Sequence, residues 1–277
     1  MSVRKINHLR RCAIPRFVAS CCVLVMVALS ACAHKPTKAY TTQDIDTLFM
    51  QKKLRQPIRV DSKTVFIDTR SDFAYAMLHA PQAIHVQWDD FAKNSNHNVL
   101  KKDLSRVTSR LALLGISPQS KIVVLSGGQS SWMEAGRVAW ALLYIGIPDV
   151  QLVDQSALGL RYYNVMPPPR PNAPQWSPNP IDRLICTSSE LAKLTASPKP
   201  HQHVLDFRAS GGPLRANRFF NRHGRPNVEM VKVLQKLGFD LDDRIVVVSN
   251  HGLKSAAVTF ALTAMGFRNV GNCIGVQ

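Results

Sequence analysis

The stretch of sequence that most suggests chemistry is residues 245–262, IVVVSNHGLKSAAVTFAL. An apolar run is followed by a short polar loop with a glycine and then by an amphipathic segment. This order presents a nucleophile at the end of a parallel strand, where the next helix begins. The first loop residue, where a nucleophile would lie, is Ser249. A serine hydroxyl is a nucleophile only when a base lies beside it.

The loop offers Ser249 only one nearby base, His251. We expect this ring to point elsewhere, because it lies two residues away in a tight loop. We therefore interpret Ser249 as a helix cap whose hydroxyl accepts a hydrogen bond from a backbone N–H near Lys254. The inward N–H groups at a helix N-terminus would suit a small oxyanion. Lys254 either adds a charge there or faces solvent. The predicted anion-binding loop comprises Ser249, Asn250, His251, Gly252, Leu253, Lys254 and Ser255.

The body of the chain repeats one design. Residues 65–70 (VFIDTR) and 203–208 (HVLDFR) are apolar runs that end in Asp-x-Arg. Further on, residues 121–128 (KIVVLSGG) match residues 244–252 (RIVVVSNHG). Two copies of one α/β domain are the simplest explanation.

In both copies a helical pattern follows the second run, with apolar residues at i, i+3, i+4 and i+7 until Gly146 or Gly266. Continuous apolar strands that alternate with helices indicate a buried parallel sheet. We therefore expect an α/β fold of two tandem domains, each a mainly parallel sheet flanked by helices. Ligands of such sheets bind beyond the carboxyl ends of the strands. Ser126, like Ser249, occupies that position.

A proline-rich segment separates the copies. Residues 164–180, NVMPPPRPNAPQWSPNP, contain seven prolines in 17 residues, which excludes helix and regular sheet. We expect an extended linker, with Trp176 packed on one of the domains. The predicted division is a first domain at 55–163, the linker at 164–180 and a second domain at 181–277.

The N-terminus does not belong to the predicted fold. Residues 1–16 carry five basic residues, and residues 17–29 form an uncharged, mostly apolar run of 13 residues. This run is short for a membrane span, which needs about 20 residues, and suits a signal peptide. It ends in Leu29-Ser30-Ala31-Cys32, which resembles the lipobox of bacterial lipoproteins. We predict a signal peptide at 1–31, lipidation of Cys32 and a tether at 32–54. An ordinary signal peptide and a retained anchor are the alternatives.

The residue after Cys32 is Ala33 rather than the aspartate that marks inner-membrane retention in lipoproteins. By that resemblance we expect the protein in the bacterial cell envelope, held by its lipid anchor on the periplasmic face of the outer membrane. Acyl chains hold a protein on a membrane without spanning it.

Cysteine usage agrees with export. The mature body keeps only Cys186 and Cys273, whereas the other four of the six cysteines lie in the leader. The two could pair in an exported protein, but the sequence does not show that the geometry permits it. No Cys-x-x-Cys or His-x-x-x-His spacing suggests a metal, and we predict no metal site and no cofactor.

The formal net charge is +17, from 35 basic and 18 acidic residues. A positive protein favours polyanionic partners or an anionic membrane surface, although a solvated basic surface also explains the excess. We expect no nucleic-acid partner, because no basic repeat with interleaved aromatic residues is present.

Most of residues 55–277 resembles the rhodanese family in its tandem sulfurtransferase form. Residues 65–86, VFIDTRSDFAYAMLHAPQAIHV, are similar to the family's opening strand, its Asp-x-Arg and its later Gly-His-Ile-Pro-Gly-Ala box. Residues 249–256, SNHGLKSA, are similar to the active loop Cys-x-x-Gly-Val-Thr-Ala in the second domain of mercaptopyruvate and thiosulfate sulfurtransferases. Ser249 stands where that loop has its cysteine, and Lys254 where it has threonine.

The resemblance implies a reaction in which a loop thiolate attacks the outer sulfur of a donor and becomes a persulfide. Ser249 and Ser126 stand at the two loop positions, and a hydroxyl cannot form a persulfide. The second domain is also shortened. The loop serine follows the aspartate by 58 positions in the first copy (68 to 126) and by 43 in the second (206 to 249).

We therefore expect an envelope lipoprotein with tandem rhodanese-like domains that lacks sulfurtransferase activity. It would act as a module that binds a small oxyanion (thiosulfate, sulfate or phosphate) or docks an unidentified protein. The alternative is an active sulfurtransferase that uses Cys273 or Cys186. We interpret the two Asp-x-Arg pairs, Asp68 with Arg70 and Asp206 with Arg208, as braces between neighbouring loops.

Overall fold

The computed structural model describes residues 50–93, 96–100, 103–128, 131–165, 169–209 and 214–275. All of them belong to one compact unit, Gln43–Gln277. The predicted signal peptide and the lipidation site Cys32 lie outside the described residues. Within the part that the structure describes, no helix is both long enough and apolar enough to cross a membrane.

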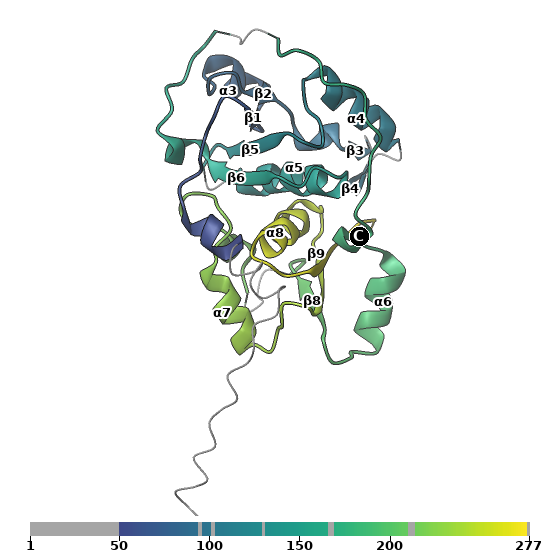
Figure 1. Ribbon diagram of the computed structural model, residues 1–277. Helices are drawn as coiled ribbons and strands as arrows, with labels where there is room; N and C mark the ends of the chain where they lie inside the picture. Colours follow the sequence, from purple (N-terminus) through teal and green to yellow (C-terminus); the bar gives the residue numbers. More distant parts are fainter. Residues whose placement is uncertain are drawn as a thin grey trace, which may run out of the picture. The chain divides into compact units, whose positions relative to one another are not determined.

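Two parallel sheets of four strands each form the body of this unit (Figure 1). The first sheet has the strand order β2-β1-β5-β6 and the second has β7-β10-β9-β8. This arrangement confirms the predicted α/β fold with two tandem domains, called the first and second halves below. The strands are β1 (Thr64–Asp68), β2 (Ile84–His85), β5 (Lys121–Ser126), β6 (Val150–Asp154), β7 (Ile185–Cys186), β8 (Gln202–Asp206), β9 (Arg244–Val248) and β10 (Asn269–Cys273).

Helices cover both faces of each sheet. The α-helices are α3 (Asp72–Met77), α4 (Leu104–Leu113), α5 (Trp132–Tyr144), α6 (Ser188–Ala196), α7 (Glu229–Lys236) and α8 (Leu253–Ala264). The 3-10 helices are η1 (Trp88–Asp90), η2 (Gln155–Leu158), η3 (Asp182–Leu184) and η4 (Ala216–Phe219), and a short antiparallel pair is formed by β3 (Ala92–Lys93) and β4 (Asn96–Leu100). As predicted, α5 and α8 end just before Gly146 and Gly266, whose φ angles of 106° and 101° suit only glycine.

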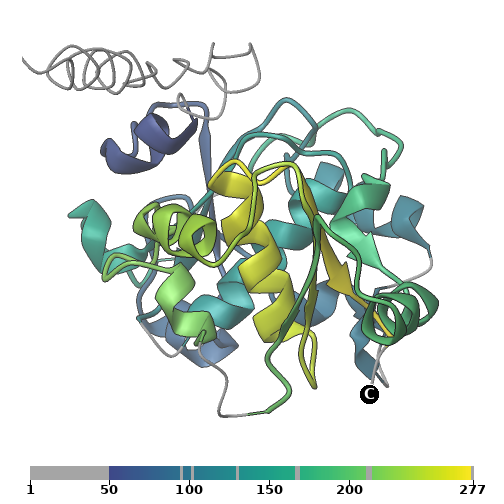
Figure 2. The ribbon, with the colours of Figure 1, turned by 90° about the horizontal axis from the view of Figure 1, so that it is seen from below.

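Alternation along the buried strands divides the apolar side chains between two faces. In the first sheet, Phe66 and Val123 pack with Tyr75 of α3, whereas Ile67 and Val124 face the core that includes α4 and α5. The second sheet repeats this plan with α6 on one face and α7 and α8 on the other. Figure 2 shows α8 in yellow between α7 and α6 in green.

The two halves meet where α5 packs against α8, between the two sheets (Figure 1). Gly136 of α5 lies directly against Ala257 of α8, and a Cβ atom at position 136 would come within 2.4 Å of the Ala257 Cβ. Each is the fifth residue of its helix, so the contact relates equivalent positions of the two copies. Glycine is required at position 136 because the second helix occupies the space of a side chain.

Residues 50–56 join the halves from outside the sheets. Lys53 pairs with Asp149 of the first half at 3.2 Å, and Arg55 pairs with Glu229 of the second half at 2.9 Å. Arg225 of the second half donates to the carbonyls of residues 53 and 56. Burial of this guanidinium lowers the pKa of Arg225.

Residues 169–180 of the proline-rich segment run along the first half. Trp176 packs against the core, and its indole N–H donates to the Ile116 carbonyl at 3.0 Å. Ala173 and Asn179 donate backbone hydrogen bonds to Ala112 and Ile145 of the first half. The expected packing of Trp176 on a domain is thus confirmed, and the first half is that domain.

The halves differ at one sheet edge. In the first half, β2 pairs with β1 beyond the Asp-x-Arg strand. In the second half the equivalent strand β8 is the last of its sheet, and β7 instead extends the opposite edge beside β10. The shorter segment between β8 and β9 forms η4 and α7. Among the described residues, the second half thus has no counterpart of the edge strand β2.

Candidate functional site

Ser249 directly follows β9 and is 2% exposed. Its Oγ accepts a hydrogen bond from the backbone N–H of Ser255 at 3.1 Å and donates one to the Ser255 hydroxyl at 3.0 Å. Ser255 is the third residue of α8, so its N–H is one of those that a helix leaves unsatisfied. The expected hydrogen bond from a backbone N–H near Lys254 is confirmed, with Ser255 as the donor, but the prediction of Ser249 as the N-cap is wrong, because Gly252 occupies that position.

Asn250, His251 and Lys254 of this loop are exposed, whereas Gly252 and Ser255 are buried. Gly252 adopts a left-handed conformation with a φ angle of 66° at the start of α8. The side chains of His251 and Lys254 are exposed, while the hydroxyl of Ser249 is buried and bonded to Ser255. Among the hydrogen bonds of the described residues, none is donated by the backbone N–H groups of residues 251–254. The loop can therefore present N–H groups to an anion.

Ser126 occupies the equivalent position in the first half and is 1% exposed. Its hydroxyl contacts the Asp154 carboxylate at 3.4 Å, a long distance for an O–H···O hydrogen bond. The following turn is closed by Ser131, whose Oγ accepts from the Gly127 N–H at 2.6 Å. This second loop also lacks a thiol.

The two Asp-x-Arg pairs brace their loops, as predicted. Arg70 binds the Asp68 carboxylate through Nε at 3.0 Å and Nη2 at 2.7 Å, and Nη2 also donates to the Leu78 carbonyl. The aliphatic part of Arg70 lies against Gly127 in the Ser126 loop. The side chain of Asp68 is fully buried. This pair therefore supports the loop rather than facing a substrate.

In the second half, Arg208 binds Asp206 with nearly the same geometry, through Nε at 3.1 Å and Nη2 at 2.6 Å. The Asn250 amide then donates to the Arg208 carbonyl at 3.3 Å, which joins the pair to the Ser249 loop. The hydrogen bond from the Arg208 side chain lowers the pKa of Asp206.

The two cysteines of the body form a disulfide between the neighbouring strands β7 and β10. Cys186 and Cys273 are both buried, in a cluster with Leu191 of α6 and with Val246 and Val248 of β9. This cluster covers the face of the second sheet opposite to α8. The bonded sulfur atoms therefore offer no free thiol to the Ser249 loop, which counts against the alternative that used Cys273 or Cys186.

One group within the described part of the chain could hold a metal ion: His201, Asp240 and Asp243, whose ligand atoms lie within 4.8 Å of one another. The Asp243 carboxylate instead accepts hydrogen bonds from His201 at 2.9 Å and from His203 at 2.8 Å. Burial raises the pKa of Asp243, but the hydrogen bonds from Asp240, His203 and His201 outweigh burial, so this pKa lies below its ordinary value. The group braces the amino ends of β8 and β9, away from both loops.

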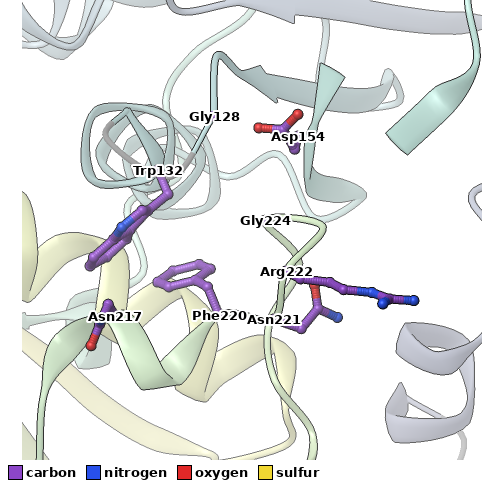
Figure 3. A pocket seen from close by; sticks show the side chains of 8 residues that line it. All are labelled: Gly128, Trp132, Asp154, Asn217, Phe220, Asn221, Arg222 and Gly224. Atoms are coloured by element: carbon purple, nitrogen blue, oxygen red, sulfur yellow. The ribbon is translucent and has the colours of Figure 1, made fainter. Parts of the chain in front are cut away.

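A cavity of about 250 Å³ lies at the Ser126 loop, between residues of the two halves (Figure 3). We call it the Asp154 cavity. The first half contributes Trp132 and Asp154, and the second half contributes Phe220 and Arg222 among others. A second cavity of about 360 Å³ lies near Arg55 and Arg225. Neither is lined by residues of the predicted anion-binding loop.

Asp154 is not among the site residues predicted from the sequence. The signal was nevertheless present, because this aspartate ends the apolar run of β6, which pairs with β5 so that Ser126 lies opposite Asp154. An acidic residue at the carboxyl end of a parallel strand is a candidate for ligand binding. Phe220 and Arg222 carried no such signal, because they reach the cavity from the other half.

Comparison with known proteins agrees with this fold. Residues 50–159 match the family model described as the rhodanese-like domain. No curated protein matches the chain. A solved structure that resembles it is SseA from Escherichia coli, a 3-mercaptopyruvate sulfurtransferase, with a TM-score of 0.62 and 15% identity over 77% of this chain and 92% of SseA.

Two further solved structures are similar. The anaerobic ergothioneine biosynthesis enzyme from Chlorobium limicola, in complex with trimethyl histidine, has a TM-score of 0.63 and 14% identity over 83% of this chain. YnjE has a TM-score of 0.62 and 16% identity over 83% of this chain. The chain spans 65% and 63% of those two proteins, less than two thirds of either. Likeness at such low identity shows a shared fold and leaves the chemistry to the residues of the site.

Proposed function

We propose that this chain, a sulfurtransferase-like protein of the rhodanese family, binds a ligand or partner and does not transfer sulfur. Its matched domain is residues 50–159. The observation that carries this proposal is the pair of buried loop serines. Ser249 and Ser126 are each less than 3% exposed, and the Ser249 hydroxyl is already bonded to Ser255.

The chemistry supports the proposal. In sulfur transfer, a thiolate attacks the outer sulfur of thiosulfate, a sulfur–sulfur bond forms and sulfite leaves. A cysteine thiol has a pKa near 8.5, and the N-terminus of a helix lowers it further. A hydroxyl is a much weaker acid and gives no persulfide that a second thiophile could remove. A serine nucleophile would need an adjacent base to activate it.

The ligand that the Ser249 loop supports best is a small oxyanion such as thiosulfate, sulfate or phosphate. The backbone N–H groups of residues 251–254 are available, α8 begins at Leu253, and Lys254 adds a positive charge at the surface. Aligned N–H groups and the helix dipole both favour an anion at this position. Should no anion bind, the proposal narrows to docking of a protein partner.

We further propose that the protein is an exported lipoprotein, anchored through Cys32 on the periplasmic face of the outer membrane. The support is the charged leader, the apolar run and the Leu-Ser-Ala-Cys box, in that order. The disulfide between Cys186 and Cys273 is compatible with an oxidising compartment such as the periplasm.

The decisive test measures cyanide-dependent thiocyanate formation from thiosulfate and from mercaptopyruvate. We expect no turnover by the wild-type protein. Ser249→Cys places a thiol in the loop and should give trace activity, whereas Ser126→Cys, the matched change in the first half, should give none. Mass spectrometry after donor treatment should show no adduct of about 32 Da on wild-type protein, the mass of one sulfur atom gained by a persulfide.

Wild-type turnover comparable with that of an authentic sulfurtransferase would remove the proposal. A sulfur adduct on Cys186 or Cys273 would restore the alternative. Titration of the same preparations with sulfate, measured by calorimetry, distinguishes oxyanion binding from protein docking. Binding that weakens in Lys254→Ala but not in Lys193→Ala, an exposed lysine on α6, supports the anion site. Absence of binding at high sulfate concentration favours protein docking.

A further inference from the structure

The Asp154 cavity contains a carboxylate that the protein does not neutralise within the described residues. Asp154 is 7% exposed, and no ion pair joins it to any residue that the structure describes. Its Oδ1 accepts from the backbone N–H and the hydroxyl of Ser156, at 2.9 and 2.5 Å. Its Oδ2 has only the Ser126 hydroxyl at 3.4 Å. One oxygen of a largely buried carboxylate therefore keeps most of its capacity to accept hydrogen bonds.

A buried charge without a partner is unfavourable, because the carboxylate has lost much of its hydration. A bound cation would replace the favourable interaction with water that the Asp154 carboxylate loses on burial. The position is also well fixed, since the Asp154 N–H donates to the His223 carbonyl of the other half at 2.7 Å. Gly224 lies so close that a Cβ there would come within 2.8 Å of the Asp154 nitrogen. The carboxylate is held in place before any ligand arrives.

Two aromatic rings form another wall of the cavity. Trp132, at the start of α5, and Phe220, after η4, lie with ring centroids 4.7 Å apart and tilted by 36°. In Figure 3 Asp154 lies above the two rings, and all three residues line the same cavity. Aromatic faces attract organic cations and cover their apolar parts. Asp154 and Trp132 come from the first half and Phe220 from the second, so only the assembled pair of halves offers the carboxylate with both rings.

We propose that the Asp154 cavity binds a small organic cation, an ammonium compound with an apolar body. The ammonium group would donate to Oδ2 of Asp154, and the apolar body would lie against Trp132 and Phe220. The volume of about 250 Å³ suits a ligand of few heavy atoms.

The other ligand classes fit less well. An anion would face the Asp154 carboxylate, and the lining residue Arg222 is exposed and points away from Asp154 in Figure 3. The Arg222 Nε instead donates to the His223 ring at 3.0 Å. A bare metal ion would find one carboxylate and two aromatic rings, whereas hard cations require several oxygen ligands. A neutral apolar ligand would leave the charge of Asp154 uncompensated.

This site is distinct from the Ser249 loop, where we propose that an anion binds.

The experiment titrates the full mature chain with benzylammonium and, in parallel, with benzyl alcohol as its neutral counterpart, by isothermal calorimetry at low salt. We expect benzylammonium to bind with one-to-one stoichiometry and benzyl alcohol to bind at least tenfold more weakly, because hydrogen bonds to charged groups are the stronger ones. Rising ionic strength should weaken only the benzylammonium binding.

Asp154→Asn removes the charge and retains an oxygen that can accept from Ser156. It should reduce benzylammonium affinity about tenfold or more. Asp149→Asn, which removes a surface carboxylate from the same half, is the matched control and should leave affinity unchanged. Trp132→Leu tests the aromatic wall without touching the charge and should reduce affinity severalfold.

Several results would overturn the proposal: no benzylammonium binding at millimolar concentration, equal affinity for benzyl alcohol, or unchanged affinity in Asp154→Asn. If Asp154→Asn does not fold, as judged by circular dichroism, the decision passes to Trp132→Leu and the salt dependence. Sulfate binding at the Ser249 loop is measured separately, so either site can fail without the other.

Discussion

The two halves carry the same Asp-x-Arg pair in two different environments. In the first half the side chains of Asp68 and Arg70 are 0% and 14% exposed. In the second half those of Asp206 and Arg208 are 41% and 38% exposed, although the hydrogen bonds are nearly the same. The difference follows from the sheet edge, because β2 pairs with β1 whereas no strand within the described residues lies beyond β8. One motif can thus be a core element in one copy and a surface contact in the other.

The loop serines differ for a similar reason. Ser126 lies opposite Asp154 across the β5–β6 pair. In the second half, Val247 of β9 pairs with Asn272 of β10, so Ile274 lies opposite Ser249 two positions further along. The Ser249 hydroxyl accepts a hydrogen bond from the Ser255 N–H. The residue on the neighbouring strand therefore distinguishes the proposed cation site from the proposed anion site.

The largest expected effect separates the two Asp-x-Arg pairs. Asp68→Asn leaves the Arg70 guanidinium largely buried without its counter-charge, and we expect a loss of about 3–5 kcal/mol in the free energy of unfolding. The matched change Asp206→Asn breaks an exposed pair, so we expect about 0–1 kcal/mol. Urea denaturation of both variants measures the difference. Equal losses would show that burial of the first pair is not what distinguishes the halves.

A smaller effect is expected at the contact between α5 and α8. Gly136→Ala places a methyl group 2.4 Å from the Ala257 Cβ, and this overpacking should cost about 1–3 kcal/mol, reduced by the better helix propensity of alanine. The exchange Gly136→Ala with Ala257→Gly moves the methyl group to the other helix. The double variant should therefore be more stable than the sum of its single changes indicates, as a double-mutant cycle would reveal. Simple additivity would mean that the helices separate instead.

The smallest effect concerns the loop hydroxyls. Ser249→Ala removes the hydrogen bond to the third residue of α8, and we expect a loss of about 0.5–2 kcal/mol, as for helix caps. Ser126→Ala removes only a contact of 3.4 Å, and we expect at most about 0.5 kcal/mol. Thermal unfolding of the two variants side by side compares them. A larger loss for Ser126→Ala would reverse our assignment of roles.

Features that depend on local order were predictable from the sequence. Apolar periodicity, terminal glycines and a polar loop predict the strands β1, β5, β8 and β9, the helices α5 and α8 and the hydrogen bond of Ser249 to the start of α8. The Asp-x-Arg braces were predictable because both partners lie two positions apart on one strand end.

Features that depend on which segments become neighbours were not predictable in the same way. The disulfide requires β7 to lie beside β10, across 87 positions of sequence. The Asp154 cavity requires Phe220 of one half to meet Trp132 of the other. The apolar periodicity within either half does not predict these contacts, which form only when the segments pack together.

The bond between Cys186 and Cys273 gives the second half a property that its hydrogen bonds cannot provide. It closes the chain into a covalent ring that holds β7 through β10. A protease that cuts the backbone once inside this ring releases no fragment, because both new ends stay tethered through sulfur. The half with the exposed brace and the open sheet edge is thus also the half that tolerates a single break, for as long as its surroundings remain oxidising.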